Sequence, residues 1–155
     1  MKLTTKGRYA VMAMVDLAQN ISGKPVNLAE ISDRQAISLS YLEQLFSKLR
    51  RAGLVTSVRG PGGGYRLAER AENIRISEVI LAVDEPIRTT GCMPGTAAGC
   101  IRKSSRCMTH DLWEELGHQI HGYLSSVSLA DVCGGRIYAG PIRAQSEPIS
   151  EIAAE

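Results

Sequence analysis

Three cysteines and one histidine lie close together in the chain, at a spacing that could hold a metal. They follow the pattern Cys92-x7-Cys100-x6-Cys107-x2-His110, within a stretch rich in glycine and other small residues. Thiolates and imidazole suit a transition metal or an iron–sulfur cluster. A disulfide, or thiols that respond to oxidants without a metal, would use the same residues.

The expected cell compartment and the cysteine spacing bear on whether these residues form a disulfide, a metal site or a thiol switch. The sequence has no run of about 18 apolar residues, so no membrane span is expected, and its N-terminus is that expected of a cytoplasmic protein. Disulfides rarely persist in that compartment, which disfavours one here. Structural zinc usually involves short Cys-x2-Cys pairs, which are absent, although three cysteines and a histidine could still bind it. An iron–sulfur cluster, zinc and a metal-free thiol switch all stay open.

Charge is distributed unevenly along the chain. The first 66 residues hold ten Lys or Arg against four acids, a net +6, whereas the remaining 89 hold eight against twelve, a net −4. This asymmetry favours a polyanion as the partner of the first half, although a solvated basic face would have the same composition. Aromatic residues make up only 5% of the chain, which argues against a surface that stacks on bases.

Apolar periodicity in the first half predicts three helices, at about 4–19, 28–34 and 38–52. Asn27 is expected to cap the second helix, with Glu30 reaching back three residues. The third helix is expected to bury one face, formed by Leu39, Leu42, Leu45, Phe46 and Leu49. Two short helices joined by a tight turn are typical of a helix-turn-helix.

A β-hairpin is predicted directly after these helices, which is the position of a wing. Residues 54–58 alternate like a strand, 59–64 are a glycine-rich turn, and 65–67 return as a second strand. The glycines do not predict a phosphate cradle, because no Gly-Lys-Ser/Thr follows and the turn leads into a strand. Residues 74–76 are expected to pair weakly with the wing, before a short helix that ends at Pro86.

A long helix is predicted from about Thr109, with an apolar stripe formed by Leu112, Trp113, Leu116, Ile120, Tyr123, Leu124 and Val127. So small a wing domain offers little surface to cover this stripe, which therefore predicts a dimerisation helix; packing within one chain is the alternative. The fold is expected to be mainly α with a small β-hairpin. Its parts are a winged helix-turn-helix domain (1–84, with the helix-turn-helix at about 28–51 and the wing at about 54–67), a cluster-binding loop (85–108), a dimerisation helix and turn (109–133), and a flexible tail (134–155).

Candidate DNA-contacting residues lie on the third helix and the wing. The helix is expected to enter the major groove, where Ser40, Tyr41, Glu43 and Gln44 would face the bases. Glu43 could accept from a cytosine amino group, or could instead form a capping box with Ser40. Arg59, at the wing tip, could enter a minor groove or contact a phosphate. No catalytic constellation is visible, so an enzyme is not predicted.

Three segments resemble the IscR family of bacterial iron–sulfur cluster regulators: MKLTTKGRYA at 1–10, ISLSYLEQLF at 37–46 and GLVTSVRGPGGGY at 53–65. The resemblance covers about 1–133, including the ligand loop. It implies a homodimeric winged-helix repressor of genes for iron–sulfur cluster assembly, which also binds a second class of DNA site without its cluster. The implied 2Fe–2S ligands are Cys92, Cys100, Cys107 and His110, and the implied DNA contacts are Ser40, Glu43, Gln44 and Arg59.

The sequence departs from that family in one respect. The intervals of seven and six residues between the cysteines are longer than is usual there. A relative that responds to iron or nitric oxide through a 4Fe–4S cluster is therefore the alternative, beside a zinc or thiol redox switch. Nitric-oxide-sensing relatives use an acidic residue near the start of the first helix, where this chain has Lys6, Gly7 and Arg8, and this favours the 2Fe–2S interpretation.

Overall fold

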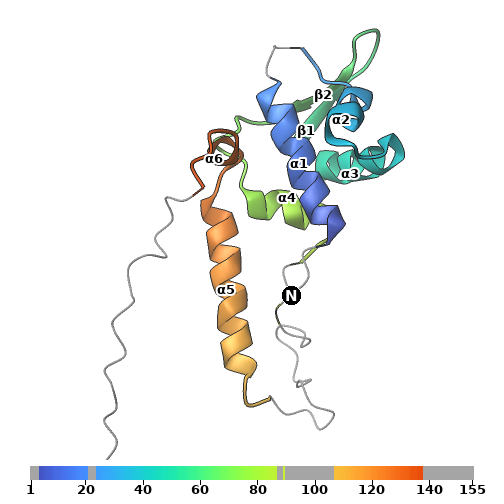
Figure 1. The fold of residues 1–155 in the computed structure, drawn as a ribbon. Helices are drawn as coiled ribbons and strands as arrows, with labels where there is room; N and C mark the ends of the chain where they lie inside the picture. The colour runs from blue at the N-terminus through green and yellow to red at the C-terminus, as the bar shows by residue number, and fades with distance from the viewer. Residues whose placement is uncertain (1–3, 21–23, 87–88, 90–106, 138–155) are drawn as a thin grey trace, which may run out of the picture.

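The computed structural model describes residues 4–20, 24–86, 89 and 107–137. Its elements are α1 (Thr5–Gln19), α2 (Leu28–Gln35), α3 (Leu39–Arg51), β1 (Val55–Val58), β2 (Gly64–Leu67), α4 (Ile76–Ala82), α5 (His110–Ser126) and α6 (Leu129–Cys133) (Figure 1). The fold is therefore mainly helical with one β-hairpin, as predicted. Cys92, Cys100 and most of the predicted ligand loop lie outside the described residues.

Polar side chains begin the first two helices, and the cap at Asn27 is the one that the sequence predicted. Thr4 Oγ1 accepts from the backbone N–H of Lys6 at 3.2 Å, and Asn27 Oδ1 accepts from that of Ala29 at 3.0 Å. Each bond satisfies a donor that has no partner within its own helix. Glu30 was predicted to reach back toward the start of α2. Its carboxylate instead lies 3.7 Å from the Arg34 guanidinium, one turn later along the helix.

One hydrophobic core joins α1, α3, α4 and α6 to the hairpin. Phe46 on α3 is fully buried, and its ring meets that of Tyr65 on β2 edge to face, with 4.8 Å between centroids. The predicted buried face of α3 is confirmed except at Leu39, which is 42% exposed. Leu39 is the first residue of α3, so the apolar stripe begins before the helix has reached the core.

The wing pairs with residue 26 and not with residues 74–76 as predicted. β1 and β2 are antiparallel, from Val55 opposite Leu67 to Val58 opposite Gly64, and Val26 forms an isolated bridge with Tyr65. A Cβ on Gly64 would lie 2.3 Å from the Val26 carbonyl oxygen, so glycine permits this close approach. Arg75 forms its bridge with Ser128, because the neighbouring isoleucines are buried in the core beside the α5–α6 junction.

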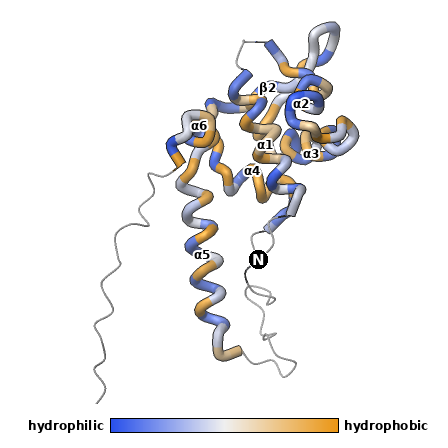
Figure 2. The backbone as a smooth tube through the Cα atoms, in the orientation of Figure 1, coloured by the Kyte–Doolittle hydropathy of each residue, from blue (hydrophilic) through white to orange (hydrophobic). Residues whose placement is uncertain are grey.

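Helix α5 extends away from the wing domain as a long rod (Figure 1) and carries apolar residues along its length (Figure 2). At its C-terminal end Tyr123 and Leu124 pack against the core. At its N-terminal end Leu112, Trp113 and Leu116 are 62%, 43% and 41% exposed. The described chain therefore covers only part of the predicted stripe.

The start of the predicted flexible tail is attached to the fold. The backbone N–H of Arg136 donates to the backbone carbonyl of Asp131 at 2.9 Å, and the Tyr123 hydroxyl donates to the Ile137 carbonyl at 3.0 Å. The flexible tail was predicted from composition, which gives no information on contacts between distant residues. Residues 138–155 lie outside the described part of the chain. Among the described residues, no helix is both long and apolar enough to cross a membrane.

Candidate DNA-binding surface and cluster ligands

The solvent-facing side of α3 presents Ser40, Glu43 and Gln44 together, at the i, i+3, i+4 spacing of one helix face. The alternative capping role of Glu43 is wrong, because Ser38 is the N-cap and Ser40 lies inside the first turn. Tyr41 is only half-exposed, and its ring packs against that of Tyr9 on α1 with 6.0 Å between centroids. Ser40, Glu43 and Gln44 are therefore the side chains of the predicted set most available to base edges.

The wing turn holds Arg59 at an exposed tip. Gly60 and Gly62 have φ angles of +106° and +74°, and the N–H of Gly63 donates to the Gly60 carbonyl at 2.9 Å. Residues with a Cβ rarely adopt such φ values, so the glycine run is required by the turn itself. This explains the glycine-rich segment without a bound phosphate and leaves Arg59 facing outward.

A short turn after α4, residues 84–86, is bonded to helix α3. Lys48 Nζ on α3 lies 2.6 Å from Asp84 Oδ2, and each group shifts the pKa of the other: Asp84 below and Lys48 above its usual range. Asp84 adopts a left-handed backbone conformation, with φ of 55°. Consequently α4 ends at Ala82, before the Pro86 that was predicted to end it.

The 84–86 turn is also bonded to α1. Glu85 is 8% exposed, and its two carboxylate oxygens accept from the backbone N–H groups of Thr4 and Gly7 at the start of α1. Burial alone would raise the pKa of this carboxyl, but the Thr4 and Gly7 hydrogen bonds outweigh it and hold the pKa below its usual range. A carboxylate here satisfies two unpaired helix donors and interacts favourably with the helix dipole.

Sequence reasoning missed both contacts of this turn. Asp84 and Glu85 are adjacent acids after a short helix, and nothing in their local pattern identifies partners 36, 78 and 81 residues away. A third contact lies just beyond the turn, where the Thr89 hydroxyl donates to the Trp113 carbonyl of α5 at 2.5 Å. A Cβ on Gly117 would come 2.6 Å from Thr89 Oγ1, so Gly117 leaves room for this crossing.

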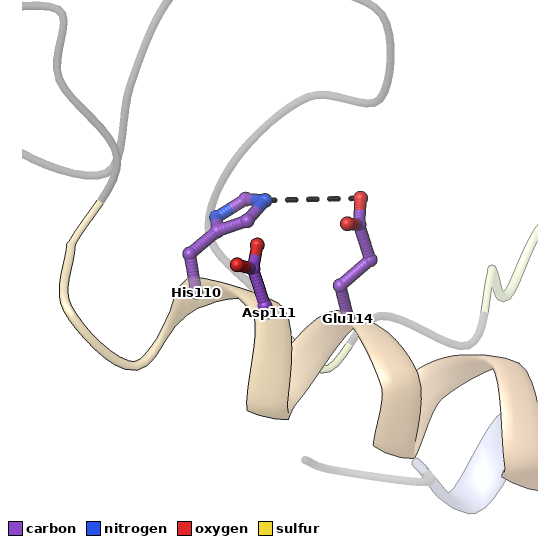
Figure 3. A group of neighbouring side chains, drawn as sticks. All are labelled: His110, Asp111 and Glu114. Atoms are coloured by element: carbon purple, nitrogen blue, oxygen red, sulfur yellow. Dashed lines mark ion pairs between the residues drawn. The ribbon is translucent and has the colours of Figure 1, made fainter.

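Two of the four predicted ligands, Cys107 and His110, are held together at the start of α5. The backbone N–H of His110 donates to the Cys107 carbonyl at 3.0 Å, Cys107 is half-buried, and the imidazole is 7% exposed. His110 Nε2 faces Glu114 Oε1 at 3.7 Å, with the Asp111 carboxylate beside them (Figure 3). A thiolate and an imidazole three residues apart are a donor set that an iron–sulfur cluster accepts.

Cys133 lies apart from this pair. It ends α6, its Sγ is 3.9 Å from the Val15 carbonyl on α1, and burial raises the pKa of its thiol. A raised pKa disfavours the thiolate that binds metals, which agrees with leaving Cys133 out of the ligand set. His118 and His121 are exposed on α5.

A comparison with known protein families matches residues 3–135 to Rrf2, described as an iron-dependent transcriptional regulator. The chain belongs to the Rrf2 family. The helix-turn-helix, the wing and α5 all fall within the matched range. The sequence-based prediction of a transcriptional regulator that is not an enzyme is confirmed.

Rrf2 relatives include the HTH-type transcriptional regulators IscR of Vibrio campbellii and Photorhabdus laumondii. They are 55% and 56% identical over 132 residues, covering 85% of this chain and 77% and 79% of theirs. The solved structure of T. potens IscR matches with a TM-score of 0.69 and 38% identity over 88% of both chains. CymR, the global cysteine regulator of B. subtilis, matches with a TM-score of 0.73 and 31% identity, over 87% of this chain and 98% of CymR. The predicted resemblance to IscR and the predicted fold class are confirmed.

Proposed function

We propose that this Rrf2 regulator controls its DNA binding through a 2Fe–2S cluster held by Cys92, Cys100, Cys107 and His110. One observation carries the proposal: the 84–86 turn, which leads into the ligand loop, is bonded both to the reading helix α3 and to the start of α1. A change in the loop therefore has a short physical route to the DNA-binding surface.

The donor set supports this choice of cofactor. Three thiolates and one imidazole match a 2Fe–2S site in which histidine replaces one cysteine, and Cys107 and His110 already lie one turn apart. When bound, the cluster supplies a rigid cross-link between residues that are otherwise joined only through the loop. The longer intervals between cysteines make a 4Fe–4S cluster the variant to be tested.

Communication would run through the ends of the loop. Cys92 lies six residues after Pro86, Cys107 lies just before α5, and His110 is the first residue of α5. With the four ligands fixed, the 84–86 turn has fewer conformations. This would maintain the ion pair between Asp84 and Lys48 and the hydrogen bonds from the first turn of α1 to Glu85. Without ligation the turn relaxes and α3 gains freedom relative to α1, which weakens its placement on the first class of site.

DNA recognition is assigned to Ser40, Glu43 and Gln44 in the major groove and to Arg59 in the minor groove. Glu43 would discriminate between two classes of site, because a carboxylate is tolerated beside a cytosine amino group and costly beside phosphates or guanine acceptors. The cluster-loaded form would bind the first class, repressing genes for iron–sulfur cluster assembly, and the cluster-free form would bind only the second.

A homodimer is proposed as the DNA-binding unit. The exposed Leu112, Trp113 and Leu116 form one face of α5, of the kind that a second copy of the same helix covers in a symmetric dimer. Two copies would present two reading helices to the half-sites of a palindromic operator.

The cysteines offer a matched test of this function. Cys107→Ala removes a proposed ligand, whereas Cys133→Ala removes a half-buried thiol outside the ligand set. Under anaerobic conditions, fluorescence anisotropy on an assembly-gene operator should show tight binding for the wild type and Cys133→Ala, and weak binding for Cys107→Ala. Equal affinity of all three proteins for that operator would contradict cluster control.

A further inference from the structure

His110 is the first residue of α5 and Glu114 lies one turn later, so their side chains meet on the same face of the helix. Nε2 of the imidazole faces Oε1 of Glu114 at 3.7 Å (Figure 3). Asp111 belongs to the same group, and the ligating atoms of the three residues lie within 4.8 Å of one another. The imidazole therefore presents its Nε2 edge to negative charge.

A carboxylate beside one ring nitrogen determines which nitrogen is available to a metal. In the neutral imidazole one nitrogen carries the proton and the other the lone pair, and a carboxylate favours the proton on the nitrogen nearest to it. Metal-binding histidines commonly donate their second N–H to such a partner, which fixes both tautomer and ring orientation. Here Nε2 is the nitrogen beside the carboxylate, which leaves the lone pair on Nδ1.

We propose that Glu114 is a positioning residue for the His110 ligand: it holds the proton of Nε2 and so presents Nδ1 to the cluster. This inference rests on the proposed function, because it concerns how one of the four ligands is prepared. The His110 side chain is 7% exposed and that of Glu114 is 45% exposed, so a buried ring is paired with a carboxylate that is partly open to solvent. The negative charge beside the ring would also strengthen its donation to iron and lower the reduction potential of the cluster.

A general effect of the helix dipole would explain acids in this turn without any role for the histidine. That explanation predicts that removing the Glu114 charge changes only the stability of α5. Glu115 offers the matched comparison, because it is exposed on the same turn and its carboxylate accepts from Gln119 Nε2 at 2.6 Å. Glu114→Gln and Glu115→Gln make the same chemical change one residue apart.

The first measurement uses the full chain without cluster, with ¹⁵N-labelled histidine, at a pH above the histidine titration range. Long-range ¹H–¹⁵N NMR distinguishes the two tautomers, and His110→Gln identifies the His110 signals. We expect the Nε2–H tautomer in the wild type and in Glu115→Gln. In Glu114→Gln that preference should fall, because a carboxamide can rotate to donate as well as accept.

The second measurement uses the cluster-loaded chain. After reduction of the cluster by dithionite to its paramagnetic state, pulsed electron paramagnetic resonance with site-labelled histidine should show Nδ1 bound to iron. A chelator should strip the cluster from Glu114→Gln about tenfold faster than from the wild type or Glu115→Gln, and the reduction potential of Glu114→Gln should be more positive. Nδ1–H in the cluster-free wild type, Nε2 bound to iron, or equal behaviour of the two glutamine variants would each overturn the inference. If the wild type takes up no cluster, the proposed function fails and Glu114 loses its role with it, whereas a bound cluster with an Nδ1–H tautomer in the cluster-free chain overturns only this inference.

Discussion

Lys48 on helix α3 forms a 2.6 Å ion pair with Asp84, in the turn that precedes the proposed ligand loop. The neighbouring Glu85 is bonded to Thr4 and Gly7 at the start of α1. Two consecutive acids thus connect one short turn to two helices of the DNA-binding domain.

Asp84→Asn should weaken the dependence of DNA affinity on cluster occupancy while leaving the fold intact. The pair is exposed, so thermal unfolding should barely change. The ratio of operator affinities between the loaded and cluster-free forms should fall about fivefold, at the lower end of typical coupling between two sites. Anisotropy titrations of both forms measure this ratio. Glu69→Gln removes an exposed acid elsewhere and should leave the ratio unchanged; an unchanged ratio in Asp84→Asn would disprove transmission through this pair.

Glu43→Ala should let the cluster-free protein bind the first class of site. The exposed Glu43 carboxylate repels phosphates and acceptor groups on the bases. Its removal therefore abolishes an unfavourable contribution to the free energy of binding. Gln44→Ala, one residue along the same face, should instead weaken binding to any site that uses the amide. Competition titrations with both classes of operator measure the selectivity. If Glu43→Ala showed the same selectivity as the wild type, Glu43 would have no part in discriminating between the two classes of operator.

Leu112→Asp with Leu116→Asp should convert a dimer to a monomer. Both side chains are exposed on the apolar face of α5, where charge would be buried by a second copy. Sedimentation equilibrium should report the mass of one chain for the variant and of two for the wild type. His118→Asp places the same charge on the opposite face and should stay dimeric. A monomeric wild type at concentrations that saturate the operator would rule out the dimer.

The interior of the wing domain contains a charged network whose effect depends on pH. Asp16 on α1 is 3% exposed and accepts from Arg34 Nη2 at 2.7 Å and from Gln35 Nε2 at 2.8 Å. Burial alone would raise the pKa of Asp16, but hydrogen bonds from Arg34, Gln35 and Asn20 hold it below its ordinary value of 3.8. A carboxyl with a lowered folded-state pKa stabilises the fold above its unfolded-state pKa, and this stabilisation is lost as pH falls.

Asp16→Asn should therefore lower the free energy of unfolding by about 2 kcal/mol at neutral pH, because the charged acceptor of several donors is lost. The difference from the wild type should stay constant down to about pH 5 and shrink below about pH 4. Urea denaturation followed by circular dichroism across this range tests both statements. Asp33→Asn, at an exposed position on α2, serves as the control. A difference that persists undiminished into acid would show that the charge of Asp16 is not its source.

Local patterns were sufficient to predict the helices and the wing. Caps such as Thr4 and Asn27 act within three residues, and the i, i+3, i+4 stripe of α3 identifies its buried face without knowledge of the partner. The glycine run predicted a turn because positive φ angles are a property of the residues themselves.

Contacts between distant segments could not be predicted in this way. The pairing of Arg75 with Ser128, and not with the wing, depends on where α5 ends relative to α4. The Asp84 and Glu85 contacts likewise require α3 and α1 to be in place first. At the candidate site, spacing predicted Cys107 and His110 as ligands, but the approach of Glu114 to Nε2 follows from the orientation of two side chains on α5.

The proposed 2Fe–2S cluster is held by Cys92, Cys100, Cys107 and His110. The most direct test is Mössbauer spectroscopy of the protein purified without oxygen, together with iron, sulfide and zinc analysis. We expect two iron and two sulfide per chain and two distinct iron sites in equal amounts, because one iron has a histidine ligand. Zinc at one per chain with no visible absorbance, or the signature of a 4Fe–4S cluster, would contradict the claim.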